Sequence, residues 1–466
     1  MSKQPTVDNP YTRGIAEFVA NLKYDAIPDD VRQRIKLLIL DALGCGLYGA
    51  DLEWSRILQR RLAKLDTSSS STVWGTKQKL SAPHAALVNG SQVQGFELDD
   101  MHHLGILHTG AVVLPALISI AETNSGLSGK EFLTAAVAGY EIGPRVGICM
   151  GSTEHIGQGW HSGATLGVFS AAAGSARGLK LDTDKTVHAL GIAGTQSSGL
   201  MSAQYGSMVK RMHAGRAAQS GLYGAQFADE GFTGIINVFE SPYGGFCTTF
   251  SRSTDRFNLE ELTAGLGSVW QTMGVRLKYY ACVGTTHATI DMIQDMRAER
   301  PFGPDDVAKV VVYGSESSKH HMGWKYIPQG ITSAQLNLSY CVASLLLEGE
   351  VFVDQFTEAK LTEPARLALA EKVEMFHDPA ITAKGPQFRH LVRIEVTLKD
   401  GTKMERTAEI SRHKKNFASD AEVVAKFEKL AVKVLPKAQV EELRDAVLGL
   451  DKLDDAAKVA RLLAKH

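Results

Sequence analysis

The segment from residue 91 to residue 110, SQVQGFELDDMHHLGILHTG, concentrates more groups that exchange a proton near neutral pH than any other window of the chain. It lies between two apolar helical runs, so we expect a polar loop held by two buried helices. Such loops line clefts, because a rigid scaffold positions reactive side chains on its connections. A solvated acidic loop is the alternative for any single residue, but the cluster as a whole favours a site. The groups are Glu97, Asp99, Asp100, His102, His103 and His108.

A second cluster, Trp160-His161-Ser162, precedes a run rich in glycine. The imidazole of His161 can exchange protons with a ligand there, and the glycines allow a ligand to approach closely. A capping or core histidine fits this position nearly as well.

Two more clusters carry cations. SAQYGSMVKRMHAG (202–215) places Lys210, Arg211 and His213 just ahead of an expected helix, and cations beside free amides at a helix N-terminus form an anion site. An ordinary basic loop is the alternative. RLKYYACVGTTHATID (276–291) contains Lys278 and His287, either of which fits a surface position equally well.

Together these groups suit proton transfer at a carbon atom beside a carboxylate. That C–H bond is weakly acidic, so an enzyme must supply a positioned base, and cations for the charge that builds on the oxygens. Elimination, decarboxylation and epimerisation all fit. The loop also offers carboxylate and imidazole ligands for a metal ion, but the nearby lysines supply positive charge without one, so we expect no metal. The sequence lacks the GxGxxG, GxxxxGK[ST], HExxH and GxSxG patterns of other enzyme classes.

Composition excludes several further classes. The 466 residues, 44% hydrophobic and 22% charged, are typical of a globular protein with two or three domains. Lys plus Arg (50) balances Asp plus Glu (51), so no basic field for nucleic acid is indicated. Five scattered cysteines argue against a zinc ribbon and a disulfide framework. With no apolar signal segment or membrane-length apolar run, we expect a cytoplasmic protein that binds neither membranes nor nucleic acid.

Helix follows helix over the first 270 residues. Pro28 with two carboxylates, Ser81 with Pro83, and Ser128 with Glu131 are typical helix starts. After His161, small residues recur every three or four positions along one expected helix and would pack against a neighbouring backbone. These are Gly163, Gly167, Ala171 and Gly174.

The pattern changes near residue 270. Residues 307–317 contain a β-branched run, and residues 388–410 predict two strands around a Lys-Asp-Gly turn, with helical segments between them. The predicted fold class is therefore mainly α. A large, discontinuous all-helical domain comprises residues 1–269 and 412–466, and a smaller α+β domain, residues 270–411, is inserted into it.

These segments resemble the MmgE/PrpD family, which includes 2-methylcitrate dehydratase, cis-aconitate decarboxylase and iminodisuccinate epimerase. The resemblance implies that the C-terminal helices complete the helical domain, that the α+β domain is a lid, and that the active site lies between them in a homodimer. It also implies chemistry on small di- or tricarboxylates without a metal or organic cofactor. The likeness is carried by LDALGCGLYGA, NGSQVQGFELDDMHH, HTGAVVLPA, GWHSGATLGVFSAAAGSARGL, KRMHAGRAAQSGLYGAQFADEGFTG and LKYYACVGTTHATID.

The resemblance also implies roles for individual residues. His108 and His161 would donate or accept protons, and Asp99 would orient a histidine. Lys210 and Lys278 would hold carboxylates. The remaining substrate-binding candidates are Asp100, His102, Arg211 and His213.

Several positions depart from the family pattern. Met101 replaces a common threonine, Thr109 replaces the proline of His-Pro-Gly, and Ala281 and Gly284 replace a proline and an arginine. Losing an arginine that binds a carboxylate favours a dicarboxylate, or a different third group, over a tricarboxylate. The implied activity is dehydration of a 2-methylcitrate-like acid, with decarboxylation of cis-aconitate or epimerisation of iminodisuccinate as alternatives. A non-catalytic carboxylate-binding relative and a metal-dependent hydratase are hypotheses from other classes.

Overall fold

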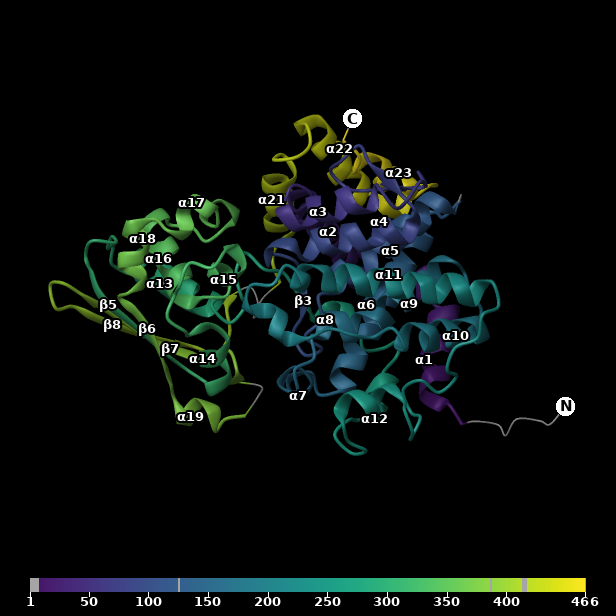
Figure 1. The fold of residues 1–466 in the computed structure, drawn as a ribbon, viewed down its shortest axis with the longest axis horizontal. Helices are drawn as coiled ribbons and strands as arrows, with labels where there is room; N and C mark the ends of the chain where they lie inside the picture. The colour runs from purple at the N-terminus through teal and green to yellow at the C-terminus, as the bar shows by residue number, and fades with distance from the viewer. Residues whose placement is uncertain (1–7, 125, 386–387, 413–416, 466) are drawn as a thin grey trace.

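Two lobes lie side by side in the computed structural model, which describes residues 8–124, 126–385, 388–412 and 417–465 (Figure 1). The larger lobe is built from helices and holds both the first and the last helix. The smaller lobe contains a four-stranded sheet. The prediction of a mainly α fold is confirmed. Within the described ranges, no helix combines the length and apolarity needed to cross a membrane.

Helices α2, α4 and α6 of the larger lobe begin where the sequence predicts. Pro28 precedes α2, whose first turn carries Asp29 and Asp30. Ser128 and Glu131 form a reciprocal capping box at the start of α6. The helices are α1 (Pro10–Asn21), α2 (Asp29–Gly49), α3 (Glu53–Leu62), α4 (Ala82–Val93), α5 (Thr109–Thr123), α6 (Gly129–Cys149), α7 (Ser152–Gly157), α8 (Ser162–Thr165), α9 (Gly167–Gly178), α10 (Thr183–Gly194), α11 (Val209–Asp229) and α12 (Phe246–Ser251).

Two details of the prediction are wrong. The expected glycine-striped helix is broken at Leu166 into the short α8 and the longer α9. The larger lobe is also not purely helical, because β1 (Ser71–Thr72) pairs with β2 (Lys79–Leu80), and β3 (Met101–His102) pairs with β4 (Val275–Arg276). The second ladder joins the acidic loop to the segment that carries Lys278.

Glycines let the central helices approach closely, as predicted. A Cβ on Gly174 in α9 would lie 3.1 Å from Val113 Cγ1 in α5. At the crossing of α4 with α11, a Cβ on Gly90 would lie 2.6 Å from the Cα of Gly215. This crossing sets the distance between the end of α4 and the first turns of α11, both of which carry site residues.

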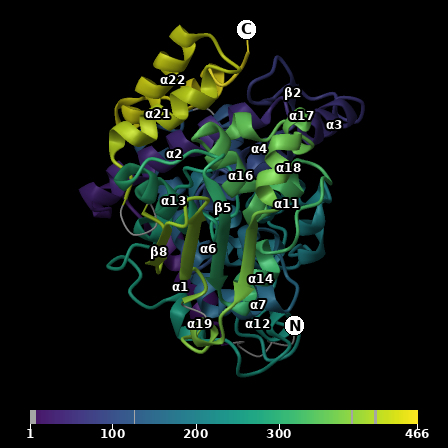
Figure 2. The same ribbon diagram turned by 90° about the vertical axis from the view of Figure 1, so that its left-hand side faces the viewer.

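The smaller lobe has strand order β6-β5-β7-β8. β5 runs parallel to β6 and antiparallel to β7, and β7 and β8 form the predicted hairpin. Helices α13 and α16 pack on the sheet, whose strands face the viewer in Figure 2. The elements are α13 (His287–Glu299), β5 (Val307–Gly314), α14 (Glu316–Met322), α15 (Ile331–Gln335), α16 (Leu338–Glu348), α17 (Glu358–Leu361), α18 (Pro364–Ala370), β6 (Val373–His377), α19 (Pro379–Thr382), β7 (Val392–Leu398) and β8 (Lys403–Ala408).

The chain then returns to the larger lobe as α21 (Asp420–Ala431), α22 (Lys437–Leu448) and α23 (Ala457–Leu462). Lys426 on α21 is buried against α2, where its Nζ lies 2.6 Å from Asp41 Oδ1. The same Nζ donates to the carbonyl of Leu98 at 2.7 Å. Lys426 therefore connects α21 both to α2 and to the acidic loop.

We expect the helix crossing to be sensitive to one methyl group. In Gly215→Ala the new Cβ would lie 2.0 Å from the Leu87 carbonyl oxygen, so backbone must move, at a cost of about 1–3 kcal/mol. Thermal unfolding should occur at a lower temperature than in the wild type. The matched control is Gly157→Ala at the end of α7, where a Cβ meets no atom within 4 Å. Equal melting temperatures for the two variants would contradict this account.

Candidate active site

A buried carboxylate connects three of the four predicted clusters. Glu97 Oε1 lies 2.7 Å from Arg211 Nη1 and also accepts from Lys210 Nζ, and its Oε2 lies 3.1 Å from Lys278 Nζ. All four side chains are buried. Three cations therefore surround one carboxylate in a region of low dielectric, where their electrostatic interactions are strong.

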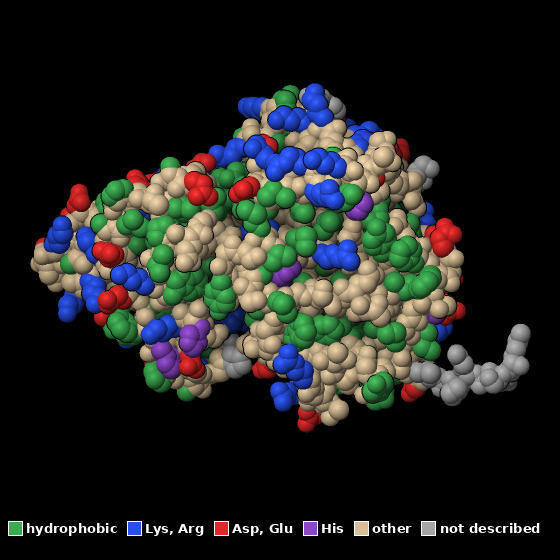
Figure 3. Space-filling model, viewed as in Figure 1, with side chains coloured by type: hydrophobic (Ala, Val, Ile, Leu, Met, Phe, Trp, Pro, Cys, Tyr) green, Lys and Arg blue, Asp and Glu red, His purple; other side chains and the backbone are tan. Residues whose placement is uncertain are grey.

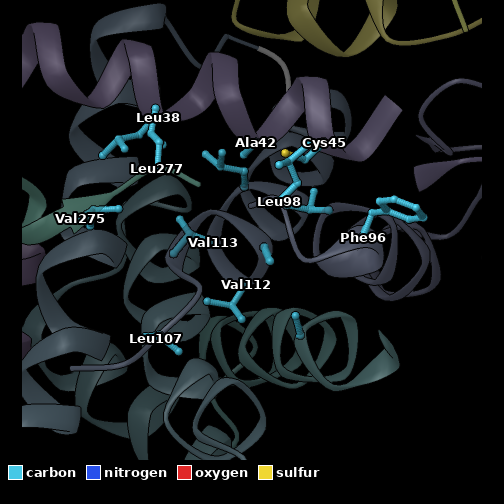
Figure 4. Packing of buried hydrophobic residues seen from close by; sticks show 14 of the residues in the cluster. Leu38, Ala42, Cys45, Phe96, Leu98, Leu107, Val112, Val113, Val275 and Leu277 are labelled. Carbon is cyan, nitrogen blue, oxygen red and sulfur yellow. The ribbon is translucent and has the colours of Figure 1, made fainter. Parts of the chain in front are cut away.

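Glu97 is held in an unfavourable backbone conformation. Its φ of 56° and ψ of 31° are left-handed, which costs on the order of 1 kcal/mol for a residue with a side chain. Its neighbours Phe96 and Leu98 are buried in the hydrophobic core, as Figure 4 shows. Burial alone would raise the pKa of Glu97, but Lys210, Lys278 and Arg211 outweigh it and hold the pKa well below its usual range. The carboxylate is therefore ionised.

Asp99 and His108 form a second pair in the acidic loop. Asp99 Oδ2 lies 2.9 Å from His108 Nδ1, and Asp99 is fully buried. The two atoms are within ion-pair distance, but their geometry does not make a hydrogen bond. The predicted contact is thus present, and the catalytic role of the pair remains a prediction.

His161 and His213 lie beside Lys210. Their ring centroids are 4.5 Å apart, and neither Nδ1 has a hydrogen-bond partner among the described residues. Burial and the charge of Lys210 lower the pKa of His213 to about 4, and burial, Lys210 and His213 hold that of His161 well below its usual range. Burial also lowers the pKa of Lys210 itself. Both imidazoles are therefore neutral at pH 7, and Lys210 gives up its proton more readily than an exposed lysine.

The cations lie inside a helix and not ahead of it, which corrects the sequence prediction. α11 begins at Val209, and the amides of Lys210 and Arg211 donate to the carbonyls of Ser207 and Met208 at 3.1 and 2.9 Å. The side chains therefore provide the positive charge at this point, and these amides are already paired.

Two predicted substrate-binding residues have other partners. Asp100 accepts from the Gly110 amide at 2.9 Å and from the Tyr140 hydroxyl at 3.1 Å, and burial raises its pKa to about 8. His102 lies in the β3–β4 ladder, and its Nδ1 accepts from the Gly105 amide at 2.9 Å. These contacts stabilise the loop, so the geometry gives no support to substrate binding by Asp100 or His102.

Sequence reasoning missed two contributors. Glu97 was part of the acidic cluster, but nothing in its spacing marks it as the shared partner of three cations. His321, on α14 of the smaller lobe, carried no signal at all. Burial, with Lys210, Arg389 and Lys278 nearby, lowers the pKa of His321 to about 4. The smaller lobe therefore places a histidine within the field of these cations.

The site is closed in this structure. Arg211 Nη2 donates to Thr332 and Gln335 of α15, each at 3.0 Å, and Gln335 Nε2 donates to the Phe96 carbonyl at 2.8 Å. These bonds cross between the lobes, which meet along a filled surface in Figure 3.

A separate groove lies away from these residues. It has a volume of about 770 Å³, and residues such as Trp324, Phe376 and Leu367 of the smaller lobe line it. No group of three His, Cys, Asp or Glu side chains is placed to hold a metal ion within the described part of the chain. The clustered histidines and cations, and not the groove, are therefore the candidate site for acid–base chemistry.

Two family models match most of the chain. Residues 13–258 match the MmgE/PrpD N-terminal domain, and residues 280–452 match the MmgE/PrpD C-terminal domain. A cis-aconitate decarboxylase-like protein of Aspergillus oryzae is 36% identical over 98% of both chains. Cis-aconitate decarboxylase of Aspergillus terreus is 34% identical over 99% of this chain and 98% of its own. A mitochondrial 2-methylcitrate dehydratase of Yarrowia lipolytica is 20% identical over 94% of this chain and 87% of its own. The resemblance seen in the sequence is confirmed: the chain belongs to the MmgE/PrpD family.

Proposed function

We propose that this protein is a lyase that removes carbon dioxide from cis-aconitate or a closely similar small unsaturated tricarboxylate. The observation that carries the proposal is the charge balance around Glu97. Lys210, Arg211 and Lys278 bring three positive charges to one carboxylate, so two positive charges remain for a ligand. Buried charges need partners, and two carboxylates of a substrate supply them.

The relatives favour decarboxylation over the dehydration that the sequence analysis ranked first. The proteins 34–36% identical to this chain are named for cis-aconitate decarboxylase, whereas the dehydratase is 20% identical. The glycine at position 284 favoured a dicarboxylate. A tricarboxylate also fits the site if two of its carboxylates pair with the cations and the third lies beside uncharged groups.

The reaction needs one acid and a cationic support. The bond between carbon and the departing carboxylate breaks, and its electron pair forms a new double bond. The electron pair of the old double bond moves to the carbon atom that carries a retained carboxylate. That carbon atom then takes up a proton. The cations would offset the charge that builds on that carboxylate. His161, His108 with Asp99, or Lys210 would supply the proton.

The second candidate is dehydration of a 2-methylcitrate-like acid. It needs a base and an acid together, and the contact between His161 and His213, with the Asp99–His108 pair, offers both. The same histidines would serve either reaction, so the products must distinguish them.

The lid and the dimer are part of the proposal. Because the site is buried, the smaller lobe would have to move away from the larger lobe to admit a ligand, which breaks the bonds from Arg211 to α15. Exposed apolar side chains at Leu200, Tyr205 and Met208 are compatible with the homodimer that the resemblance implies. The cytoplasmic location stays a prediction. Light scattering should give about twice the mass of the 50.4 kDa chain.

The substrate can be tested by proton NMR in deuterium oxide. We expect cis-aconitate to lose carbon dioxide and gain one deuterium at carbon. His161→Ala and Lys210→Ala should each reduce kcat/KM by about 10²–10⁴-fold, because they remove a proton carrier or a cation. His377→Ala, an exposed histidine on β6, is the control and should match the wild type. Loss of water from 2-methylcitrate without decarboxylation of cis-aconitate would overturn the proposal in favour of the second candidate.

The role of Glu97 predicts a change in pH dependence. Glu97 raises the pKa of Lys210 against burial, Arg211 and Lys278, which lower it. In Glu97→Gln that pKa should fall further, so Lys210 loses its charge at lower pH. The alkaline limb of kcat/KM should then shift to lower pH by about 1–3 units.

The control for this shift is Glu350→Gln, which removes an exposed carboxylate paired with Lys429. Its pH profile should match that of the wild type. An unchanged alkaline limb in folded Glu97→Gln protein would show that Glu97 does not set the charge of Lys210.

A further inference from the structure

Gln94 has a buried side-chain amide that nothing else in the site explains. It lies where α4 ends and a 3₁₀ turn (Gln94–Phe96) begins, and it is 1% exposed. Among the described residues, neither its Nε2 nor its Oε1 has a hydrogen-bond partner. Its main chain is engaged, because its N–H donates to the Gly90 carbonyl as the last bond of α4 and its carbonyl accepts from Arg211 Nη1 at 3.5 Å.

The amide faces the histidines of the site. A Cβ on Gly163 would lie 3.2 Å from His161 Cε1 and 3.6 Å from Gln94 Nε2. The imidazole of His161 and the amide of Gln94 therefore meet at Gly163, where a larger side chain would crowd both. His161 Nδ1 and His213 Nδ1 are also buried without partners among the described residues. Three unpaired polar groups thus lie together.

Such a cluster is costly unless a ligand uses it. A buried amide without a hydrogen bond destabilises a protein by about 1–3 kcal/mol. Buried polar groups are nearly always paired, and the exceptions concentrate at sites that bind something. The neighbouring cations show what binds, because their charge selects carboxylates.

We propose that Gln94 is a substrate-contact residue that donates its Nε2–H to the carboxylate that departs as carbon dioxide. This inference rests on the proposed function and names the position of the third carboxylate within it. Lys210, Arg211 and Lys278 form a cationic wall for the two retained carboxylates. Gln94, His161 and His213 form an uncharged wall for the third.

An uncharged donor suits a departing group. A cation would stabilise the carboxylate in the ground state and lose that interaction when neutral carbon dioxide forms, which raises the barrier. An amide orients the carboxylate by a directional hydrogen bond, and less interaction energy is lost when carbon dioxide forms than would be lost with a cation. A glutamine at position 94 therefore favours loss of carbon dioxide from the carboxylate on this side of the pocket.

The test measures ligand binding and stability together. The probe is propane-1,2,3-tricarboxylate, a saturated analogue without the double bond that receives the electron pair, and its Kd is measured by calorimetry. Gln94→Met keeps the volume but removes both polar atoms. It should raise the Kd of the probe and lower kcat/KM for cis-aconitate by about tenfold or more. The melting temperature of the free protein should stay the same or rise, because an unpaired buried amide is removed.

Gln92→Met is the matched control, two residues earlier on α4. Gln92 Nε2 donates to the carbonyls of Gly46 and Trp74 at 3.1 and 3.0 Å, so its loss should lower the melting temperature and leave the Kd unchanged. The opposite pattern, in which Gln94→Met lowers the melting temperature and binds the probe as tightly as the wild type, would make Gln94 structural and overturn the proposal.

A second variant covers the case in which Gln94→Met does not fold. Gln94→Glu has the same size and should repel a carboxylate, raising the Kd by about tenfold or more; unchanged binding would overturn the proposal. If the wild type binds the probe more tightly than the Gln94 variants but does not decarboxylate cis-aconitate, the proposed function is refuted and the contact between Gln94 and a carboxylate is supported. Wild-type protein that does not bind the probe would refute the contact.

Discussion

The interaction between Glu97 and its three cations determines how the rest of the site is arranged. Lys210 and Arg211 come from α11, Lys278 follows β4, and Glu97 follows the turn after α4, so one carboxylate joins segments far apart in the sequence. Without it, three positive charges would lie close together in a dry interior, which is unfavourable by several kcal/mol per ion. The left-handed backbone at Glu97 shows that the fold accepts local strain to keep this carboxylate in place.

The hydrophobic core fixes the positions of these charged residues. Phe96 and Leu98 flank Glu97, Leu107 precedes His108, and Leu277 precedes Lys278, and all four apolar side chains belong to one cluster (Figure 4). Each polar group is thus one residue from an anchored side chain and has little freedom to move. The close crossing of α4 and α11 at Gly90 and Gly215 adds the same constraint for the cations on α11. Preorganisation of this kind lets charges act on a ligand without first reorienting.

Local signals in the sequence predicted much of the fold and only part of the site. Capping at Ser128 and the β7–β8 hairpin depend on neighbouring residues, so the sequence shows them directly. The break at Leu166 does not follow from spacing, because small residues fit one long helix or two short ones equally well. The acidic loop and the cationic segment were visible as clusters. The partnership of Glu97 with Lys278 and the approach of His321 were not, because they depend on tertiary packing over long separations in the chain.

The charge states of the histidines and of the cations in this pocket depend on one another. Lys210 and burial keep the pKa of His213 and of His161 below the usual range, so the imidazoles are uncharged while the ammonium groups keep their partner Glu97. A bound anion would reverse part of this effect, because negative charge near an imidazole raises its pKa. Under the proposed function, binding of a carboxylate substrate would therefore make His161 easier to protonate when a proton is needed at carbon. Glu97 cannot have that effect alone, because its charge is already shared among three cations. The charge of the substrate itself would then complete the proposed acid.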